Sequence, residues 1–234
     1  MAQVVPPQEA ATASDLQRMT DHLVRFQESD GFWAWSLAPA QNRPPPVFES
    51  DEVATLLGCL ALGSRDAVAI TGKSAARDSR DKAAAWLAKM DPGNSTQTAA
   101  LRLLVKFRAG TPATALRSEI DRFLGRQKSD GGWGQQSDLP SDAYATGQAL
   151  YVLSLIGVKN DRAAVQRGMA FLIANQREDG SWPMTCRAQP GAKPFTNPSP
   201  ITYYGSAWAT LALMRSAPKQ ARSAIGTAAK PSTE

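Results

Sequence analysis

A seven-residue motif, Gln-x-x-Asp-Gly-x-Trp, occurs three times in the chain and constrains its fold more than any other feature of the sequence. The copies span residues 27–33, 127–133 and 176–182, and each follows a segment with the apolar spacing of an amphipathic helix. The last two copies begin 49 residues apart and the first two 100 residues apart, about twice as far. This spacing predicts a degenerate copy in between. Residues 85–93 supply it, with the helical pattern kept and the Gln and the Trp lost.

The residue types of the motif suit a structural role. Asp-Gly favours a sharp turn after a helix, because glycine accepts the left-handed backbone conformation. The Gln side chain can bond to backbone groups exposed at a helix terminus, and the Trp ring can cover them from water. We therefore expect the motif to hold helices together and not to take part in catalysis. The residues concerned are Gln27, Asp30, Gly31, Trp33, Gln127, Asp130, Gly131, Trp133, Gln176, Asp179, Gly180 and Trp182.

Proline placement divides the rest of the chain into helices, because a proline inside a helix removes a backbone donor and clashes with the preceding turn. The sixteen prolines leave eight windows free, and these are rich in Ala, Leu, Arg and Lys. Strand patterns are nearly absent, so we predict an all-α fold of about four helical hairpins. The predicted helices span residues 14–27, 49–62, 73–90, 95–108, 113–127, 141–156, 160–176 and 201–216.

The domain organisation follows from the same pattern. We predict one repeat domain over residues 14–216, an N-terminal extension over residues 1–13 and a C-terminal tail over residues 217–234. The tail is rich in Ala, Ser, Lys and Thr with little apolar periodicity, so we expect a frayed helix or disorder there.

A second repeated element opens the second helix of each hairpin. Residues 50–55 match residues 141–146, and residues 201–206 match them loosely. Ser50 and Ser141 suit the N-cap position, and the Asp that follows each of them suits the positive end of the helix dipole. The repeated unit is therefore a helix, a motif turn, a loop and a second helix.

The three turns resemble the QW motifs of the squalene cyclase and protein prenyltransferase β-subunit superfamily. Residues 142–150, 182–188 and 206–213 are most similar to bacterial squalene-cyclase-like repeat proteins, and the resemblance covers residues 14–216. It implies a terpenoid cyclase-like α/α toroid, in which inner helices line a central apolar cavity and outer helices surround them. Four hairpins are fewer than the six of a closed ring, which implies a partial or open ring. The chain is then part of a longer protein with missing N-terminal repeats, a self-associating arc or a smaller ring.

Neither catalytic signature of the superfamily is complete in this sequence. The Asp-x-Asp-Asp acid with which squalene-hopene cyclases protonate an alkene does not occur. Residues 142–146 resemble the zinc-binding Asp-x-Tyr-His-Thr of the prenyltransferases, but Ala145 takes the place of the His. The only histidine is His22, and Cys59 and Cys186 lack the neighbours of a zinc site, so we predict no metal and no cofactor. Whether the protein is an enzyme is left open.

Aromatic residues at helical spacing suggest where a ligand would bind. Tyr144 and Tyr151 are seven residues apart, Tyr204 and Trp208 are four apart, and Tyr203 is adjacent, so each pair shares one face of a predicted inner helix. One interpretation is a lining for an apolar lipid or isoprenoid that also stabilises a carbocation. The other is ordinary packing between helices.

Acidic residues occur where the predicted inner helices begin. Asp51, Glu52, Asp138 and Asp142 stand there, and Asp51 and Asp142 join the aromatic residues as ligand-lining candidates. General acid chemistry and simple stabilisation of the helix N-terminus both remain open for them.

The charge of the chain argues against a nucleic-acid partner. Lys and Arg number 26 and Asp and Glu 21, giving a net charge of +5, but basic and acidic residues alternate along the sequence. No apolar stretch reaches the ~18 residues of a membrane-spanning helix, so we predict no transmembrane segment and leave peripheral membrane contact open. Cytoplasm and periplasm both remain open as compartments.

Three functions stay open at this point. The first is a noncatalytic cyclase-like domain that binds an apolar ligand or a partner protein. The second is a terpene cyclase that is active only as part of a longer chain. The third is a carbohydrate-active α/α barrel, which paired carboxylates facing one cleft would indicate.

Overall fold

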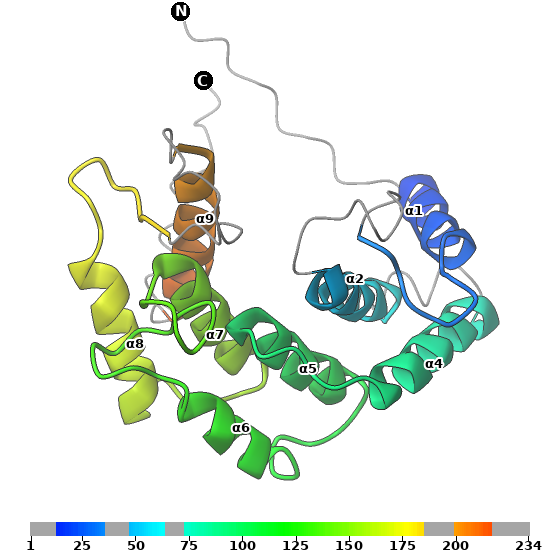
Figure 1. Cartoon of the computed structure of the whole chain (residues 1–234), viewed down its shortest axis with the longest axis horizontal. Coiled ribbons are helices and arrows are strands. Elements are labelled where there is room, and N and C mark those ends of the chain that lie inside the picture. The colour runs from blue at the N-terminus through cyan, green and yellow to red at the C-terminus, as the bar shows by residue number, and fades with distance from the viewer. Residues whose placement is uncertain (1–12, 36–46, 64–72, 185–198, 217–234) are drawn as a thin grey trace, which may run out of the picture. The chain divides into compact units, whose positions relative to one another are not determined.

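The structure, a computed structural model, describes residues 13–35, 47–63, 73–184 and 199–216. These residues form eight α-helices and no strand, and an isolated bridge pairs Gly134 with Ser141 (Figure 1). The predicted all-α fold is therefore confirmed for this part of the chain. The helices are α1 (Ala13–Arg25), α2 (Val47–Leu62), α4 (Lys73–Lys89), α5 (Thr96–Arg108), α6 (Arg117–Leu124), α7 (Ala143–Leu155), α8 (Ala163–Ala174) and α9 (Ser199–Ser216).

Each predicted window overlaps one of these helices, and α1, α2 and α9 begin one or two residues before their windows. The largest difference concerns the window 113–127, in which α6 begins only at Arg117. The reason is a turn after Pro112, whose carbonyl accepts the backbone N–H groups of Ala115 and Leu116 at 2.9 and 3.3 Å. The predicted extension, apart from Ala13, and the predicted tail lie outside the described residues.

The chain divides into two compact units, Met1–Pro92 and Gly93–Glu234, with the boundary inside the degenerate copy of the motif. The single domain over residues 14–216 stays a prediction. Among the described helices, none combines the length and the apolar character that crossing a bilayer requires.

The first unit contains α1, α2 and α4, and each of these helices contacts the other two. Its core includes Trp33, Leu56 and Leu62, whose side chains are almost completely buried. Gly58 of α2 packs directly against the Trp33 ring, since a β-carbon on Gly58 would come within 2.7 Å of that ring. The small residue lets the ring of the first turn pack directly on the helix.

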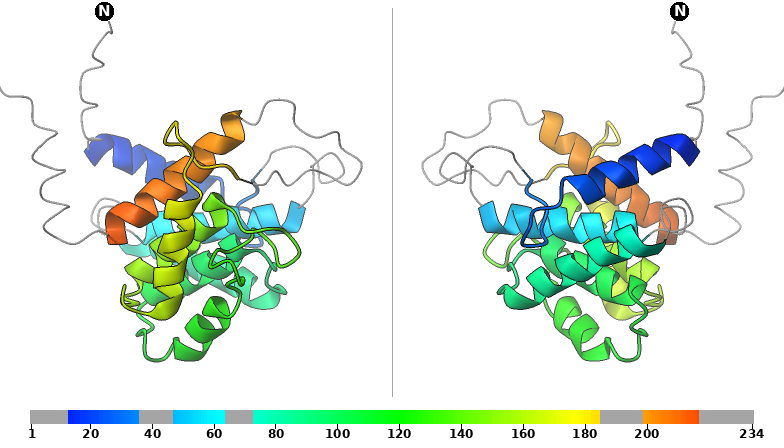
Figure 2. Two further views of the ribbon diagram at one scale, coloured as in Figure 1. Left: turned by 90° about the vertical axis from the view of Figure 1, so that its left-hand side faces the viewer. Right: turned by 90° about the vertical axis from the view of Figure 1, so that its right-hand side faces the viewer.

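The second unit contains α5 to α9, with α7 at its centre. α7 packs against α5, α8 and α9 (Figure 2), and Gly147 of α7 lies against the backbone of Trp208 in α9. Figure 1 shows α5, α7 and α9 as a row with α6 and α8 along one side of it. This alternation of inner and outer helices is the α/α arrangement that the repeat predicts. Trp133 is the largest of the fully buried side chains in its core, which also includes Leu150 and Leu153.

Candidate functional site

The three motif turns share one backbone conformation. In each turn the N–H of the second motif residue donates to the carbonyl of the sixth at 2.9 Å, and the glycine N–H donates back to the second residue at 2.8–3.0 Å. The glycines have positive φ values of 102° at Gly31, 87° at Gly131 and 80° at Gly180. A side chain would strain the backbone there, which explains why the motif uses glycine.

In the second and third turns the Asp of the motif stabilises the turn from within. Asp130 accepts the backbone N–H of Gly132 at 2.9 Å, and Asp179 accepts that of Ser181 at 2.9 Å. The hydroxyl and the N–H of Ser181 both donate to Asp179, and these bonds lower the pKa of its exposed carboxyl below the usual value.

The Trp of each turn caps the helix that precedes it. Its indole N–H donates to a backbone carbonyl ten residues earlier, close to the C-terminus of α1, α6 or α8, where carbonyls have no partner within the helix. The distances are 2.8 Å from Trp33 to Leu23, 3.4 Å from Trp133 to Phe123 and 2.7 Å from Trp182 to Leu172. The three rings are 6% exposed or less, so the cap is shielded from water.

A hydroxyl of the following inner helix accepts the backbone N–H of the same Trp. The three distances are 3.1 Å from Trp33 to Thr55, 2.9 Å from Trp133 to Thr146 and 2.9 Å from Trp182 to Ser206. These hydroxyls belong to the second repeated element, which gives that element a physical role. Each motif turn therefore joins its own outer helix to the inner helix that comes next.

The acidic candidates at the helix starts are engaged by the backbone. Asp142, and not Ser141, is the N-cap of α7, because its extended backbone lets the carboxylate accept the N–H of Ala145 at 2.8 Å. The hydroxyl of Ser141 donates instead to Asp130 at 2.8 Å. Asp142 also accepts a bond from the side chain of Gln135 at 2.7 Å.

In the first unit the corresponding residues lie inside a helix. α2 begins at Val47, so Ser50 is not an N-cap, contrary to the sequence prediction. Asp51 is buried and accepts the backbone N–H of Trp35 at 3.0 Å. Glu52 is 1% exposed, and Asp138 is exposed in the loop before α7.

The aromatic candidates lie on α7 and α9. Tyr151 and Trp208 meet edge to face, with ring centroids 5.6 Å apart. Tyr203 and Tyr204 are 72% and 64% exposed, and Tyr144 is half-buried near the start of α7. The structure thus brings Tyr151 and Trp208 together and leaves the two α9 tyrosines on the surface.

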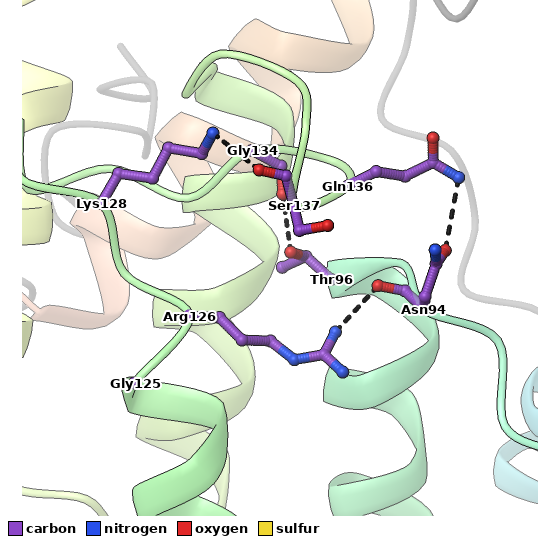
Figure 3. Close-up of a pocket in the computed structure, with 8 residues that line it drawn as sticks. All are labelled: Asn94, Thr96, Gly125, Arg126, Lys128, Gly134, Gln136 and Ser137. Carbon is purple, nitrogen blue, oxygen red and sulfur yellow. Dashed lines mark hydrogen bonds between the residues drawn. The ribbon is translucent and has the colours of Figure 1, made fainter.

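A polar pocket of about 450 Å³ lies where α5 begins and α6 ends (Figure 3). Arg126 donates to the carbonyl of Asn94 at 3.0 Å, and Lys128 donates to the carbonyl of Ser137 at 3.1 Å. Thr96 donates to the carbonyl of Gly134 at 2.6 Å. Two cations and several amide groups suit a polar group better than an apolar chain. The lining residues are Asn94, Thr96, Gly125, Arg126, Lys128, Gly134, Gln136 and Ser137.

None of the aromatic or acidic candidates lines this pocket, and no motif in the sequence predicts it. Its residues come from the ends of two helices and from the loop 134–137, which carries no periodic pattern. The sequence feature that could have indicated the pocket is a pair of basic residues, Arg126 and Lys128, on either side of the motif Gln.

The residues considered for metal binding are dispersed. His22 is exposed on α1 and stacks on Phe26, with ring centroids 4.2 Å apart. Cys59 is buried in α2, and burial raises the pKa of its thiol from 9.0 to about 11, although nearby Arg80 opposes the shift. Cys186 lies outside the described residues. Within the described ranges, no three His, Cys, Asp or Glu side chains gather where they could hold a metal ion.

Comparison with known proteins gives two matches to cyclases. The profile of the squalene-hopene cyclase C-terminal domain matches residues 99–228, more than half of the chain. A squalene–hopene cyclase of Zymomonas mobilis subsp. mobilis is 30% identical over 99 residues, which are 42% of this chain. The chain spans about 15% of the length of that relative. Both matches agree with the helix alternation and the motif turns described above.

Proposed function

The chain belongs to the squalene-hopene cyclase C-terminal domain family, and on this premise we propose that it binds an apolar, isoprenoid-type ligand on α7 and α9. It is a cyclase-like domain, and its fold is that of the terpenoid cyclase-like α/α proteins. The proposal concerns ligand binding and does not include the start of a cyclisation.

One observation carries the proposal. Tyr204, Trp208 and Leu211 lie on one face of α9, at the spacing of successive helical turns, and Tyr151 of α7 packs against Trp208. Tyr204 is 64% and Leu211 43% exposed. We call these four residues the aromatic face. Exposed aromatic and aliphatic side chains of this size favour burial against an apolar ligand.

The rings of this face also suit a positively charged group. The guanidinium carbon of Arg215 lies 5.7 Å from the ring centroid of Tyr151, a distance at which a cation is attracted to an aromatic ring. The Arg215 side chain is held there by a 2.9 Å bond from its Nε to the hydroxyl of Ser154. An isoprenoid that develops positive charge would meet rings of the same kind at Trp208 and Tyr204.

The proposal is tested by measuring ligand binding to variants of the aromatic face. Squalene or farnesol is added to the purified chain, and binding is followed by quenching of tryptophan fluorescence. Tyr204→Ala and Trp208→Phe each remove aromatic contact worth roughly 1 kcal/mol, so the Kd should rise about fivefold. Ile173→Ala is the control, because it removes an equally exposed apolar side chain from outer helix α8.

Equal affinity of the wild-type chain and both face variants would place the ligand elsewhere and refute the proposal. Absence of saturable binding to the wild-type chain would also refute it. The second candidate, a cyclase that is active only within a longer chain, is supported by the relative of which this chain spans about 15%. It predicts activity only when further repeats are added to the chain.

A further inference from the structure

Two of the three motif turns are packed against the next outer helix, and they share the contacts of the Gln amide and of the glycine. We call them the first joint, formed by residues 27–33 with α4, and the second joint, formed by residues 127–133 with α8. Each joint lies within one of the two compact units. The contacts in these joints show which groups of an outer helix a motif turn binds.

The Gln side chain ties its own turn to that helix. In the first joint the Gln27 amide donates to the carbonyls of Gly31 at 2.8 Å and Ser79 at 2.7 Å. In the second joint the Gln127 amide donates at 2.7 Å to the carbonyl of its own turn's glycine and at 2.7 Å to that of Ala164. Arg167 of α8 in turn donates from its guanidinium to the side-chain oxygen of Gln127.

The glycine and the residue before the Trp complete each joint. A β-carbon on Gly31 would lie 2.5 Å from the carbonyl oxygen of Lys82, and one on Gly131 would lie 2.8 Å from that of Arg167. Backbone therefore packs directly on backbone. Beside it an aromatic ring of the outer helix covers the turn, with Trp86 stacked on Phe32 at 5.0 Å between centroids. The second joint places the Phe171 ring in the same position, over Gly132.

The outer-helix partners occupy fixed positions. Ala164 and Arg167 precede Gln176, where the motif after α8 begins, by 12 and 9 residues. Ser79 and Lys82 precede Asp91 by the same 12 and 9 residues, and Asp91 takes the Gln place in the degenerate copy. An outer helix thus presents a carbonyl and, one turn later, a basic residue.

The third turn has no such helix among the described residues. The Gln176 amide donates only to its own Gly180, at 3.1 Å, and residues 176–180 are all exposed. A β-carbon on Gly180 would meet nothing closer than 3.9 Å, and that atom belongs to Gln176. The turn therefore has the conformation of the two packed turns, but no helix of the described part of the chain packs on its docking side.

Helix α1 carries the matching pair in the correct register. Asp15 and Arg18 precede Gln27 by 12 and 9 residues. The Arg18 guanidinium pairs with the Asp15 carboxylate, and its side chain is 74% exposed. Helix α6 provides an internal comparison, because it follows the degenerate copy that has no Gln. At the position of the basic residue it has Ser118, nine residues before Gln127. The basic residue is thus present in each outer helix except the one that follows a turn without Gln.

We propose that α1 of a second copy of this chain docks on the turn 176–182, so that copies join head to tail. The Gln176 amide then donates to the carbonyl of Asp15 in the other copy, and Arg18 there donates to the Gln176 side-chain oxygen. The Gln-to-carbonyl bond repeats both joints between two molecules, and the bond from Arg18 repeats the one from Arg167 in the second joint. The contact is heterologous, so a pair of joined copies still has one unused α1, on one copy, and one unused turn, on the other, for further copies.

Two single variants each disable one side of the contact. Gln176→Ala removes the turn's side, and Arg18→Glu removes the helix's side. Loss of one such charge-assisted bond should weaken association about tenfold. Gln166→Ala and Arg117→Glu are matched controls, because both side chains are exposed on outer helices away from these positions. Circular dichroism verifies that every variant is folded.

The assay is sedimentation velocity over a range of concentrations. The wild-type chain and both controls should form species heavier than the 25.0 kDa monomer, while each single variant alone should need about tenfold higher concentrations to form them. An equal mixture of the two single variants should form a dimer and nothing larger, since only one intact helix and one intact turn can meet.

A wild-type chain that stays monomeric at all concentrations would overturn the proposal. The turn would then be left without a partner copy, and α1 or residues 217–234 of the same molecule would be the candidates for covering it. Association that appears only after residues 217–234 are deleted would also overturn it in favour of the tail. A mixture of the two variants that stays monomeric, while the wild-type chain associates, would show that association uses another surface.

Discussion

The replacement Trp133→Ala tests the structural role of the motif most directly. The Trp133 side chain is completely buried and stacks on Phe123, with ring centroids 6.4 Å apart. Gly168 of α8 leaves room for the ring, since a β-carbon there would come within 2.8 Å of it. The ring therefore fills a space between helices that the surrounding backbone cannot close.

The expected cost follows from what the substitution removes. Trp→Ala in a closed site costs roughly 3–5 kcal/mol, and the backbone bond from residue 133 to the Thr146 hydroxyl remains possible in the variant. We therefore expect a loss of about 4 kcal/mol in the free energy of unfolding, which lowers the Tm by roughly 10 °C for a chain of this size.

The measurement is urea and thermal unfolding followed by circular dichroism. Trp133→Phe keeps a six-membered aromatic ring and loses the five-membered ring with its bond to Phe123, so its cost should be smaller than that of Trp133→Ala. Trp35→Ala is the control, because that ring is 44% exposed. A Trp133→Ala variant that unfolds within about 2 °C of the wild type, well under the expected shift, would refute the packing argument.

Three further outcomes are expected. Gly131→Ala should destabilise the protein more than Gly180→Ala. Alanine at either position carries left-handed strain of roughly 1–2 kcal/mol, but only at position 131 would it also clash with a helix backbone. Equal losses of unfolding free energy in urea would contradict this. In a Cys186→Ser background, Cys59 should react with iodoacetamide at pH 8 about a hundredfold more slowly than in the unfolded chain, because its pKa is about 11 instead of 9.0. The difference between the two reaction rates should shrink as the pH rises from about 9 to about 11. The free energy of unfolding should fall over the same range, because the Cys59 thiol loses its proton at lower pH in the unfolded chain than in the folded one. The chain alone should yield no cyclised product from squalene, because no Asp-x-Asp-Asp acid is present to start the reaction, and gas chromatography with mass spectrometry would detect any product.

The helices could be predicted from the sequence because proline and apolar spacing act locally. Each of the eight windows overlaps a helix, and the main discrepancy, at the start of α6, comes from the turn that Pro112 begins. The positions of the motif turns were equally accessible, since Asp-Gly encodes a left-handed residue without reference to distant parts of the chain.

Partners that lie far apart in the sequence were not predictable in the same way. Nothing local indicates that Gln27 bonds to Ser79, 52 residues later, in the middle of α4. The choice between Ser141 and Asp142 as N-cap also depends on a distant group, because Asp130 holds the serine hydroxyl. The polar pocket depends on three segments that meet only in the folded unit.

The bond between each motif Trp and the following inner helix also affects folding during synthesis. The hydroxyl that accepts the Trp N–H is 22, 13 and 24 residues downstream for Trp33, Trp133 and Trp182. A ribosome adds roughly 5–20 residues per second, so the second turn waits about one to three seconds for its partner and the third about one to five. Slow codons between residues 182 and 206 would extend the time during which an aromatic ring of the nascent chain stays uncovered.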